Sequence, residues 1–226
     1  MDYLEIITTS DGSHTLLNKQ LNETYHSIHG ALQESMHVFI KNGLQYYCEY
    51  QQTKNISILE VGFGTGLNAL LSLQYAMHHY VAIRYSTLEP FPLPEDVWSK
   101  LNYGNRDKGG HHFKALHEST WNSEMSLTPQ FTILKLKKSL DEVELNDVYD
   151  IIYFDAFAPA VQPELWTYQS LEKVVSPMKA GGIFVTYSAK GQLKRDLKNL
   201  GLKVETLPGP PGKNEMVRGV KVEGGS

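Results

Sequence analysis

Apolar residues follow two different spacings along this chain, and the two alternate from about residue 55 onward. Short continuous apolar runs such as DIIYFDAF and GIFVTYSA are typical of parallel strands that helices cover on both faces. Between them, apolar residues recur at the three- and four-residue spacing of amphipathic helices. Strands are predicted at residues 56–62, 84–89, 131–136, 149–155 and 182–188, and helices at residues 67–79, 95–102, 114–121, 164–178 and 191–200. This alternation predicts an α/β fold with a doubly wound sheet.

The first 54 residues have a different pattern and predict an N-terminal extension. The stretch SHTLLNKQLNETYHS is polar with scattered β-forming residues, which favours a hairpin or an extended arm. The next stretch, ALQESMHVFIKNGLQYYCEYQQ, has apolar residues at positions 32, 36, 39, 40 and 44 and predicts a helix. Residues 203–208 and 215–222, on either side of the turn PGPPGK, are predicted as edge strands. We therefore expect an N-terminal extension of residues 1–54 and one compact domain of residues 55–226.

A glycine-rich segment, ILEVGFGTG, follows the first predicted strand of this domain and precedes a predicted helix. Its glycines are Gly62, Gly64 and Gly66, and Glu60 lies two residues before the first of them. A dinucleotide fingerprint, G-x-G-x-x-G, would need its last glycine at the position of Leu67. The pattern E-x-G-x-G-x-G instead resembles the S-adenosylmethionine loop of class I methyltransferases, in which glycines let the backbone approach the cofactor. An NAD site and a purely structural turn are the alternatives.

Three carboxylates stand where a doubly wound sheet binds its ligands, at or near the carboxyl ends of strands. Glu89 ends the second strand, 23 residues after Gly66, and is predicted to accept the ribose hydroxyls of an adenosine cofactor. Glu60 either contacts the cofactor's amino group or organises the loop. Asp155 ends the apolar run IIYF, where a carboxylate can orient an amine and accept its proton, so we predict that it is catalytic. Phe157 either stacks on a base or belongs to the core.

Composition and charge exclude several classes of protein. The chain has 226 residues, 41% of them hydrophobic, and its single cysteine, Cys48, allows neither an internal disulfide nor a cysteine-based metal cluster. Nine histidines show no metal-binding spacing, so no metal is expected. No signal peptide and no membrane span are expected, because no long apolar run occurs. These features together favour a cytoplasmic protein.

The charge is unevenly distributed. The net charge is −4, from 21 Lys and Arg against 25 Asp and Glu. Residues 179–226 contain nine Lys and Arg against four Asp and Glu, a local net charge of +5. The remaining residues, 1–178, therefore carry −9. A basic C-terminal quarter suits a face that contacts phosphates, although on charge alone unevenly distributed surface charge is the favoured explanation.

Several blocks of the chain match one family and cover it nearly end to end. They are DGSHTLLNKQLNETYHSIHGALQESMHVFIKNGL, ILEVGFGTGLNALL, YSTLEPFPL, YDIIYFDAFAPAVQPELWT, GGIFVTYSAKGQLKRDL and VETLPGPPGKNEMVRG. By these blocks the chain resembles the tRNA methyltransferase domain of the MnmC family in its stand-alone, MnmD-like form. The resemblance implies a class I, Rossmann-like methyltransferase fold and S-adenosylmethionine as cofactor. It also implies N-methylation of the 5-aminomethyl group of a (2-thio)uridine at the tRNA wobble position, with Asp155 as the catalytic or amine-orienting aspartate.

The resemblance carries further expectations. The two-enzyme members of the family have an FAD-binding oxidase domain that is not found in this sequence, so neither oxidase activity nor FAD is expected. Many members have an acid near the end of the third strand that meets adenine; here that position has Lys137 and Lys138, with Ser139 or Asp141 as a weaker substitute. The anticodon arm of tRNA is the expected partner, with Lys213 and Arg218 as phosphate contacts. Lys190, Lys194 and Arg195 lie on neighbouring segments and extend the same basic surface.

Two other functions remain open at the level of sequence. One is a methyltransferase that acts on a small-molecule amine with the same glycine loop and the same Asp155. The other is a module that binds S-adenosylmethionine or RNA without catalysis. The sequence does not determine the oligomeric state.

Overall fold

The computed structural model describes residues 3–106, 110–146 and 148–222, and within them eight strands form one twisted sheet. In spatial order the strands are β10 (Leu202–Pro208), β11 (Glu215–Lys221), β9 (Met178–Thr186), β8 (Tyr149–Phe154), β4 (Asn55–Val61), β5 (Ala82–Leu88), β7 (Phe131–Leu136) and β6 (Glu124–Thr128). The five central strands are parallel to one another, namely β9, β8, β4, β5 and β7. Strands β11 and β6 run antiparallel to their neighbours. The strand order reverses between β4 and β8, which is the place where doubly wound sheets bind ligands.

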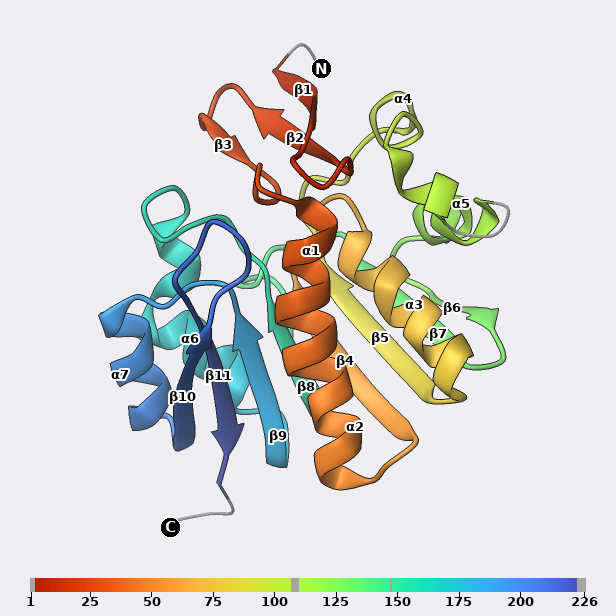
Figure 1. Cartoon of the computed structure of the whole chain (residues 1–226). Helices are drawn as coiled ribbons and strands as arrows, with labels where there is room; N and C mark the ends of the chain where they lie inside the picture. The colour runs from red at the N-terminus through yellow and green to blue at the C-terminus, as the bar shows by residue number, and fades with distance from the viewer. Residues whose placement is uncertain (1–2, 107–109, 147, 223–226) are drawn as a thin grey trace.

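Helices cover both faces of the sheet, as Figure 1 shows. One face carries the N-terminal helix, α3 (Leu67–His79), α4 (Glu95–Trp98), the short helix η2 (Asn102–Arg106) and α5 (His111–Glu118). The other face carries the short helix η3 (Pro163–Trp166), α6 (Tyr168–Val175) and α7 (Gly191–Asn199). Each face therefore has its own apolar core, because the central strands are buried on both sides.

The N-terminal extension has two parts. Strands β1 (Leu4–Thr8), β2 (His14–Asn18) and β3 (Glu23–Thr24) form a small antiparallel sheet at the carboxyl-end side of the large one (Figure 1). A continuous helix follows, made of α1 (Ala31–Ser35), a π-helical stretch η1 (Met36–Gln45) and α2 (Tyr46–Gln51). The small sheet confirms the predicted hairpin, and the helix confirms the predicted helical stripe.

The N-terminal helix packs closely on the sheet. A Cβ atom at Gly43 would lie 3.2 Å from both Tyr153 and Val185, so the absence of a side chain lets the helix approach β8 and β9. Val38 and Phe39 are buried in the same core as the strands beneath them. This packing positions the start of the helix next to the ends of β4 and β8. The domain boundary after residue 54 stays a prediction.

The predicted α/β class and all five predicted parallel strands are confirmed, with ends that shift by a few residues. Three details differ from the sequence-based expectations. Strand β6 was not predicted, because its sequence EMSLT is short and mostly exposed. Strand β11 is not an edge strand, because it lies between β9 and β10. The predicted helix 164–178 is divided at Thr167, whose extended backbone and side chain cap the start of α6.

Candidate active site

The glycine loop connects β4 to α3 in a conformation that requires glycine. Gly62, Gly64 and Gly66 have φ angles of +96°, +49° and +75°, a region that side chains with a Cβ atom rarely adopt. A Cβ atom on Gly62 would lie only 2.6 Å from the carbonyl oxygen of Asp155. The Asp155 N–H also donates to the carbonyl of Val61 at 3.0 Å. The loop and the end of β8 are therefore packed backbone against backbone.

Asn68, in the first turn of α3, joins two carboxylates. Its amide nitrogen donates to Glu60 at 3.2 Å and to Asp155 at 2.8 Å. The second oxygen of Glu60 accepts a hydrogen bond from Thr87 at 2.7 Å. Burial raises the pKa of the fully buried Glu60 to about 8, and the charge of Asp155 adds to the rise. Since Glu60 has no exposed surface, unlike the partly buried Glu89, and both of its oxygens are bonded inside the protein, this geometry favours the loop-organising role over a cofactor contact.

Glu89 follows β5 and faces the same loop. One of its carboxylate oxygens accepts a hydrogen bond from the Gly64 N–H at 2.9 Å, and the other accepts from the Phe91 N–H at 2.9 Å. Burial raises the pKa of Glu89, and these two backbone donors oppose the rise. The carboxylate is thus fixed against the loop, where a ribose is expected. We call the loop residues 60–68 together with Glu89 the donor half of the site.

The N-terminal arm lies over the loop. His26 Nε2 is 2.7 Å from the Thr65 hydroxyl, and burial lowers the pKa of His26 to about 4. The ring of Tyr25 contacts Gly64 and packs edge-on against Phe157, with 5.1 Å between the ring centroids. The arm therefore forms a wall over the loop and over the segment that follows Asp155.

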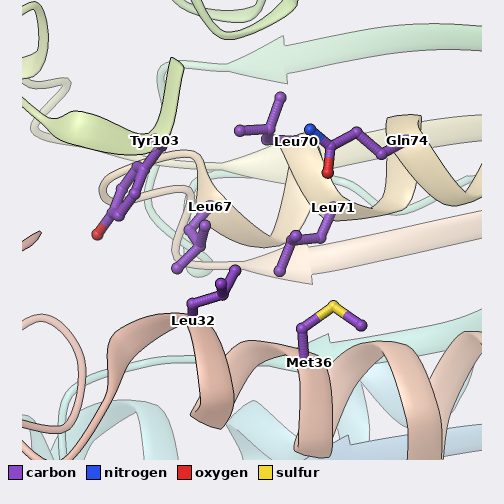
Figure 2. Close-up of a pocket in the computed structure, with 7 residues that line it drawn as sticks. All are labelled: Leu32, Met36, Leu67, Leu70, Leu71, Gln74 and Tyr103. Carbon is purple, nitrogen blue, oxygen red and sulfur yellow. The ribbon is translucent and has the colours of Figure 1, made fainter. Parts of the chain in front are cut away.

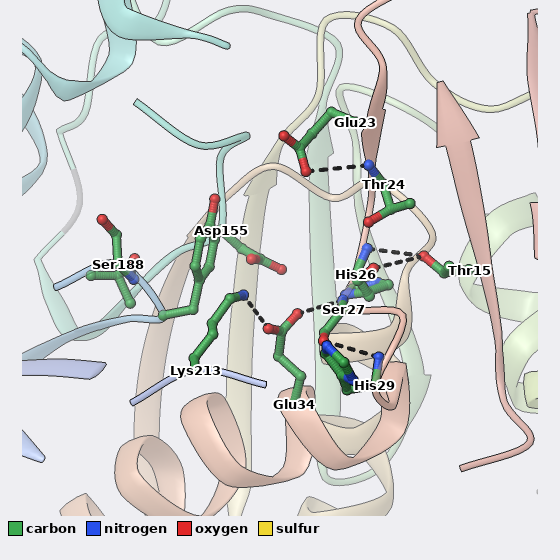
Figure 3. Close-up of polar contacts among 12 residues, drawn as sticks. Thr15, Glu23, Thr24, His26, Ser27, His29, Glu34, Asp155, Ser188 and Lys213 are labelled. Carbon is green, nitrogen blue, oxygen red and sulfur yellow. Dashed lines mark hydrogen bonds and ion pairs between the residues drawn. The ribbon is translucent and has the colours of Figure 1, made fainter. Parts of the chain in front are cut away.

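A second polar group lies beside Asp155 and comes from distant parts of the chain. Glu34, at the start of the N-terminal helix, forms an ion pair with Lys213, and its other oxygen accepts from the Ser27 N–H at 3.0 Å. The Lys213 ammonium lies 3.9 Å from the centroid of the Tyr187 ring. Figure 3 shows the Glu34 and Lys213 side chains directed toward each other next to Asp155. We call these five residues, Ser27, Glu34, Asp155, Tyr187 and Lys213, the acceptor half of the site.

The electrostatics of Asp155 suit an acid–base role. Burial, and then the negative charge of Glu34, raise its pKa to about 7, while Asn68 and Lys213 oppose the rise. A carboxyl group with a pKa near neutrality can accept a proton and release it again under ordinary conditions. Among the predicted site residues, Asp155 is the one that connects the two halves.

The two predicted phosphate contacts are in different environments. Lys213 lies in the acceptor half, with about a third of its side chain exposed. Arg218 is buried, donates to Glu205 at 2.9 Å, and lies 3.4 Å from the centroid of the Tyr46 ring. Its charge is satisfied inside the protein, so we do not carry it forward as a tRNA contact.

One central residue was absent from the sequence-based predictions. Asn68 is a buried polar residue in the apolar stretch LNALLSL, and that departure from the helix pattern was the available signal. Its carbonyl oxygen is buried and has no hydrogen-bond partner among the described residues. Such a group next to two carboxylates indicates a site that a bound molecule completes.

A separate apolar groove, with a volume of about 390 Å³, lies between the N-terminal helix and α3 (Figure 2). It is lined by Leu32, Met36, Leu67, Leu70, Leu71, Gln74 and Tyr103. None of the carboxylates described above lines it, and the residue that it shares with the donor half is the apolar Leu67. In the described part of the chain, no cluster of three or more His, Cys, Asp or Glu is arranged for a metal ion, and no helix has the length and apolarity to cross a bilayer.

The donor half fits the chemistry of S-adenosylmethionine. Glu89 supplies a carboxylate for ribose hydroxyls, and the glycine loop leaves backbone without Cβ atoms beside it. The unpartnered Asn68 oxygen can accept from a bound donor. These residues would hold the cofactor, and Asn68 connects them to Asp155.

Comparison with known proteins agrees with this fit. Residues 112–222 match the family model described as S-adenosyl-L-methionine-dependent methyltransferase. Over 220 residues the chain is 28% identical to the tRNA 5-methylaminomethyl-2-thiouridine biosynthesis bifunctional protein MnmC of Pseudomonas fluorescens, covering 89% of this chain and 32% of that protein. The chain thus spans about a third of the length of the curated relatives it matches.

Solved structures extend the comparison to the fold. The crystal structure of MnmC2 from Aquifex aeolicus superposes with a TM-score of 0.79 at 26% identity, covering 97% of this chain and 70% of that one. A second match is an S-adenosylmethionine-dependent O-methyltransferase from Thermotoga maritima, with a TM-score of 0.50 at 16% identity. This match covers 98% of this chain and 79% of that one, and it supports the fold alone. The sequence match, the structural match and the strand order together show the class I S-adenosylmethionine-dependent methyltransferase fold, and the chain is similar over nearly its whole length to MnmC methyltransferase domains.

Proposed function

We propose that this protein is an S-adenosylmethionine-dependent tRNA methyltransferase. It N-methylates the 5-aminomethyl group of the wobble (2-thio)uridine and gives 5-methylaminomethyl-(2-thio)uridine. The observation that carries the proposal is the position of Asp155, which Asn68 links to the donor half and which stands beside Glu34 in the acceptor half. The printed names of the MnmC relatives support the choice of a tRNA aminomethyl-uridine as the acceptor.

The reaction requires a neutral amine held in a fixed direction. When bound, S-adenosylmethionine supplies a methyl group on a positively charged sulfur, and the acceptor nitrogen bonds to it as the carbon–sulfur bond breaks. Asp155 accepts one proton from the acceptor's ammonium and orients the lone pair that remains. Asn68 holds the Asp155 carboxylate in place through its 2.8 Å hydrogen bond. Once Asp155 has passed this proton to solvent, its carboxylate stabilises the positive charge that develops on nitrogen.

The acceptor base reaches this site from a single-stranded loop. Bases in such loops can be turned out of the stack and held against aromatic rings, and Phe157 and Tyr25 provide a pair of rings beside Asp155. Lys190 and Arg195 are exposed near the carboxyl end of β9 and are the proposed contacts for the phosphates of the anticodon arm. The proposed substrate places the enzyme in the cytoplasm and requires another enzyme to supply the aminomethyl group. The proposed reaction uses neither a metal ion nor FAD.

The direct test is nucleoside analysis of tRNA that carries 5-aminomethyl-2-thiouridine, before and after incubation with the protein and S-adenosylmethionine. We expect the aminomethyl nucleoside to be converted to its methylaminomethyl form in tRNA. Free alkylamines at the same concentration serve as the control and should not be methylated. Transfer to free amines but not to tRNA would contradict the proposal and support a small-molecule methyltransferase. Binding of S-adenosylmethionine without any transfer would support a non-catalytic module.

A further inference from the structure

The Glu34–Lys213 ion pair joins parts of the chain that are 179 residues apart. Glu34 is buried, with 5% of its side chain exposed, whereas 31% of the Lys213 side chain is exposed. The Glu34 carboxylate is held from the other side by the Ser27 N–H at 3.0 Å. The Glu34 carboxylate is therefore held in place, whereas the partly exposed Lys213 ammonium can move away from it.

The carboxylates of Glu34 and Asp155 together require a positive charge beside them. Glu34 is buried, Asp155 is half-buried beside it, and the negative charge of Glu34 acts on Asp155, because neighbouring carboxylates repel. A buried carboxylate without a partner costs several kcal/mol in general, so an opposite charge must occupy the space. The face of the Tyr187 ring, 3.9 Å from the Lys213 ammonium, adds an attraction that is specific for cations.

Lys213 fills this space with the same functional group that the proposed acceptor carries. Its ammonium is a primary amine on a CH₂ group, and so is the aminomethyl group of the acceptor uridine. It reaches the site from the turn between β10 and β11, where its N–H donates to the Pro210 carbonyl at 2.9 Å. Because the turn lies at the surface, the side chain has solvent into which it can move.

We propose that Glu34, Asp155 and the Tyr187 ring form a seat for a primary ammonium, which Lys213 occupies in the free protein and which the acceptor's aminomethyl group takes over on binding. Glu34 is then a substrate-binding residue, and the displaced Lys213 ammonium is free to contact a substrate phosphate. The identity of the acceptor rests on the proposed function, whereas the seat for a primary ammonium does not.

The first test removes the internal ammonium and supplies an external one. Lys213→Met leaves the seat without its cation, so ethylammonium should raise the melting temperature of this variant saturably, by several degrees. Wild-type protein should show a shift at least tenfold weaker at the same concentration, and tetramethylammonium, which has no N–H, should shift neither. The double variant Lys213→Met/Glu34→Gln should lose the response.

Arg218→Met is the matched control for this test. It removes the cation of another partly buried ion pair that also packs on an aromatic ring, since Arg218 contacts Glu205 and Tyr46. Stabilisation of Arg218→Met by ethylammonium to the same degree as Lys213→Met would show a general salt effect and overturn the proposal. An equal, weak response of Lys213→Met and wild type would overturn it as well.

The second test uses wild-type protein and does not depend on the folding of a variant. Acetylation of Lys213 by limiting N-hydroxysulfosuccinimide acetate is measured by mass spectrometry relative to the exposed Lys190 in the same sample. Saturating 5-aminomethyluridine should raise the Lys213-to-Lys190 ratio at least threefold, because the ammonium leaves Glu34. Uridine should have no effect, and an unchanged ratio with the aminomethyl nucleoside would overturn the proposal. If ethylammonium binds to Lys213→Met but the protein does not methylate tRNA, the ammonium seat is supported and only the proposed function is contradicted.

Discussion

The donor half and the acceptor half of this site are built in opposite ways. In the donor half, the hydrogen bonds join residues that are 8, 25 and 27 positions apart, from Glu60 to Asn68, Gly64 to Glu89 and Glu60 to Thr87. In the acceptor half, the Glu34–Lys213 ion pair joins positions 179 residues apart, and the Asn68–Asp155 hydrogen bond that links the two halves spans 87 residues, whereas the Ser27–Glu34 hydrogen bond is local. The first is one β–loop–α–β unit, whereas the second needs the whole chain to be folded.

This difference matches the two tasks that the proposed function assigns to the protein. A glycine loop that binds S-adenosylmethionine serves many methyltransferases with different acceptors, so a local unit is sufficient. Recognition of one acceptor requires charges and rings placed around it in three dimensions, and here they come from the N-terminal helix, β8, β9 and the last turn. Variants of the two halves are therefore expected to fail in different ways.

The largest effect is expected from Asp155→Asn. The change keeps the shape and the contact with Asn68 but removes the group that accepts the proton, so methyl transfer to tRNA should fall by about 10²–10⁴-fold. Binding of S-adenosylmethionine should change little, because the donor half is unaltered. Single-turnover transfer and calorimetric binding measure the two quantities. Transfer within threefold of wild type would contradict the catalytic role of Asp155, and loss of cofactor binding would show that the halves are not separable.

A smaller effect, on folding, is expected from Gly62→Ala. The added Cβ would lie 2.6 Å from the Asp155 carbonyl oxygen at a φ of +96°, so the free energy of unfolding should fall by about 2–5 kcal/mol. Gly201→Ala is the matched control, because Gly201 also has a positive φ, +83°, but a Cβ there meets no atom within 4 Å. The control should lose only about 1–2 kcal/mol. Equal losses in urea denaturation would show that backbone conformation, and not the contact between the halves, decides the result.

The smallest effect within one pH unit is expected from Glu60→Gln, and it concerns the pH dependence of stability. Burial raises the pKa of Glu60 from 4.5 to about 8, so between these values the folded protein holds a proton that the unfolded chain has lost. The free energy of unfolding should therefore decrease as pH rises through this window, with a slope from Glu60 of up to about 1.4 kcal/mol per pH unit. Glu60→Gln cannot titrate and should flatten this part of the curve. A variant that keeps the wild-type slope in urea denaturation between pH 5 and 8 would contradict the assignment.

The sequence by itself determined the fold class, the glycine loop and the position of Asp155. These features are local, because the strand–turn–helix pattern, the positive-φ glycines and the acid at a strand end each depend on a few neighbouring residues. Glu89 could be located in the same way, since the next strand of a doubly wound sheet ends beside the loop. The family blocks added the expected cofactor and acceptor.

Only the tertiary structure decided what the remaining polar residues do. Lys213 and Arg218 lie five residues apart in one basic segment, yet Lys213 lies in the acceptor half and Arg218 is buried against Glu205 and Tyr46. Glu34 lies in a helix 179 residues before its partner. The physical reason is that local patterns fix which face a residue takes, whereas charge pairing depends on which distant segments meet when the sheet, the arm and the last turn pack together.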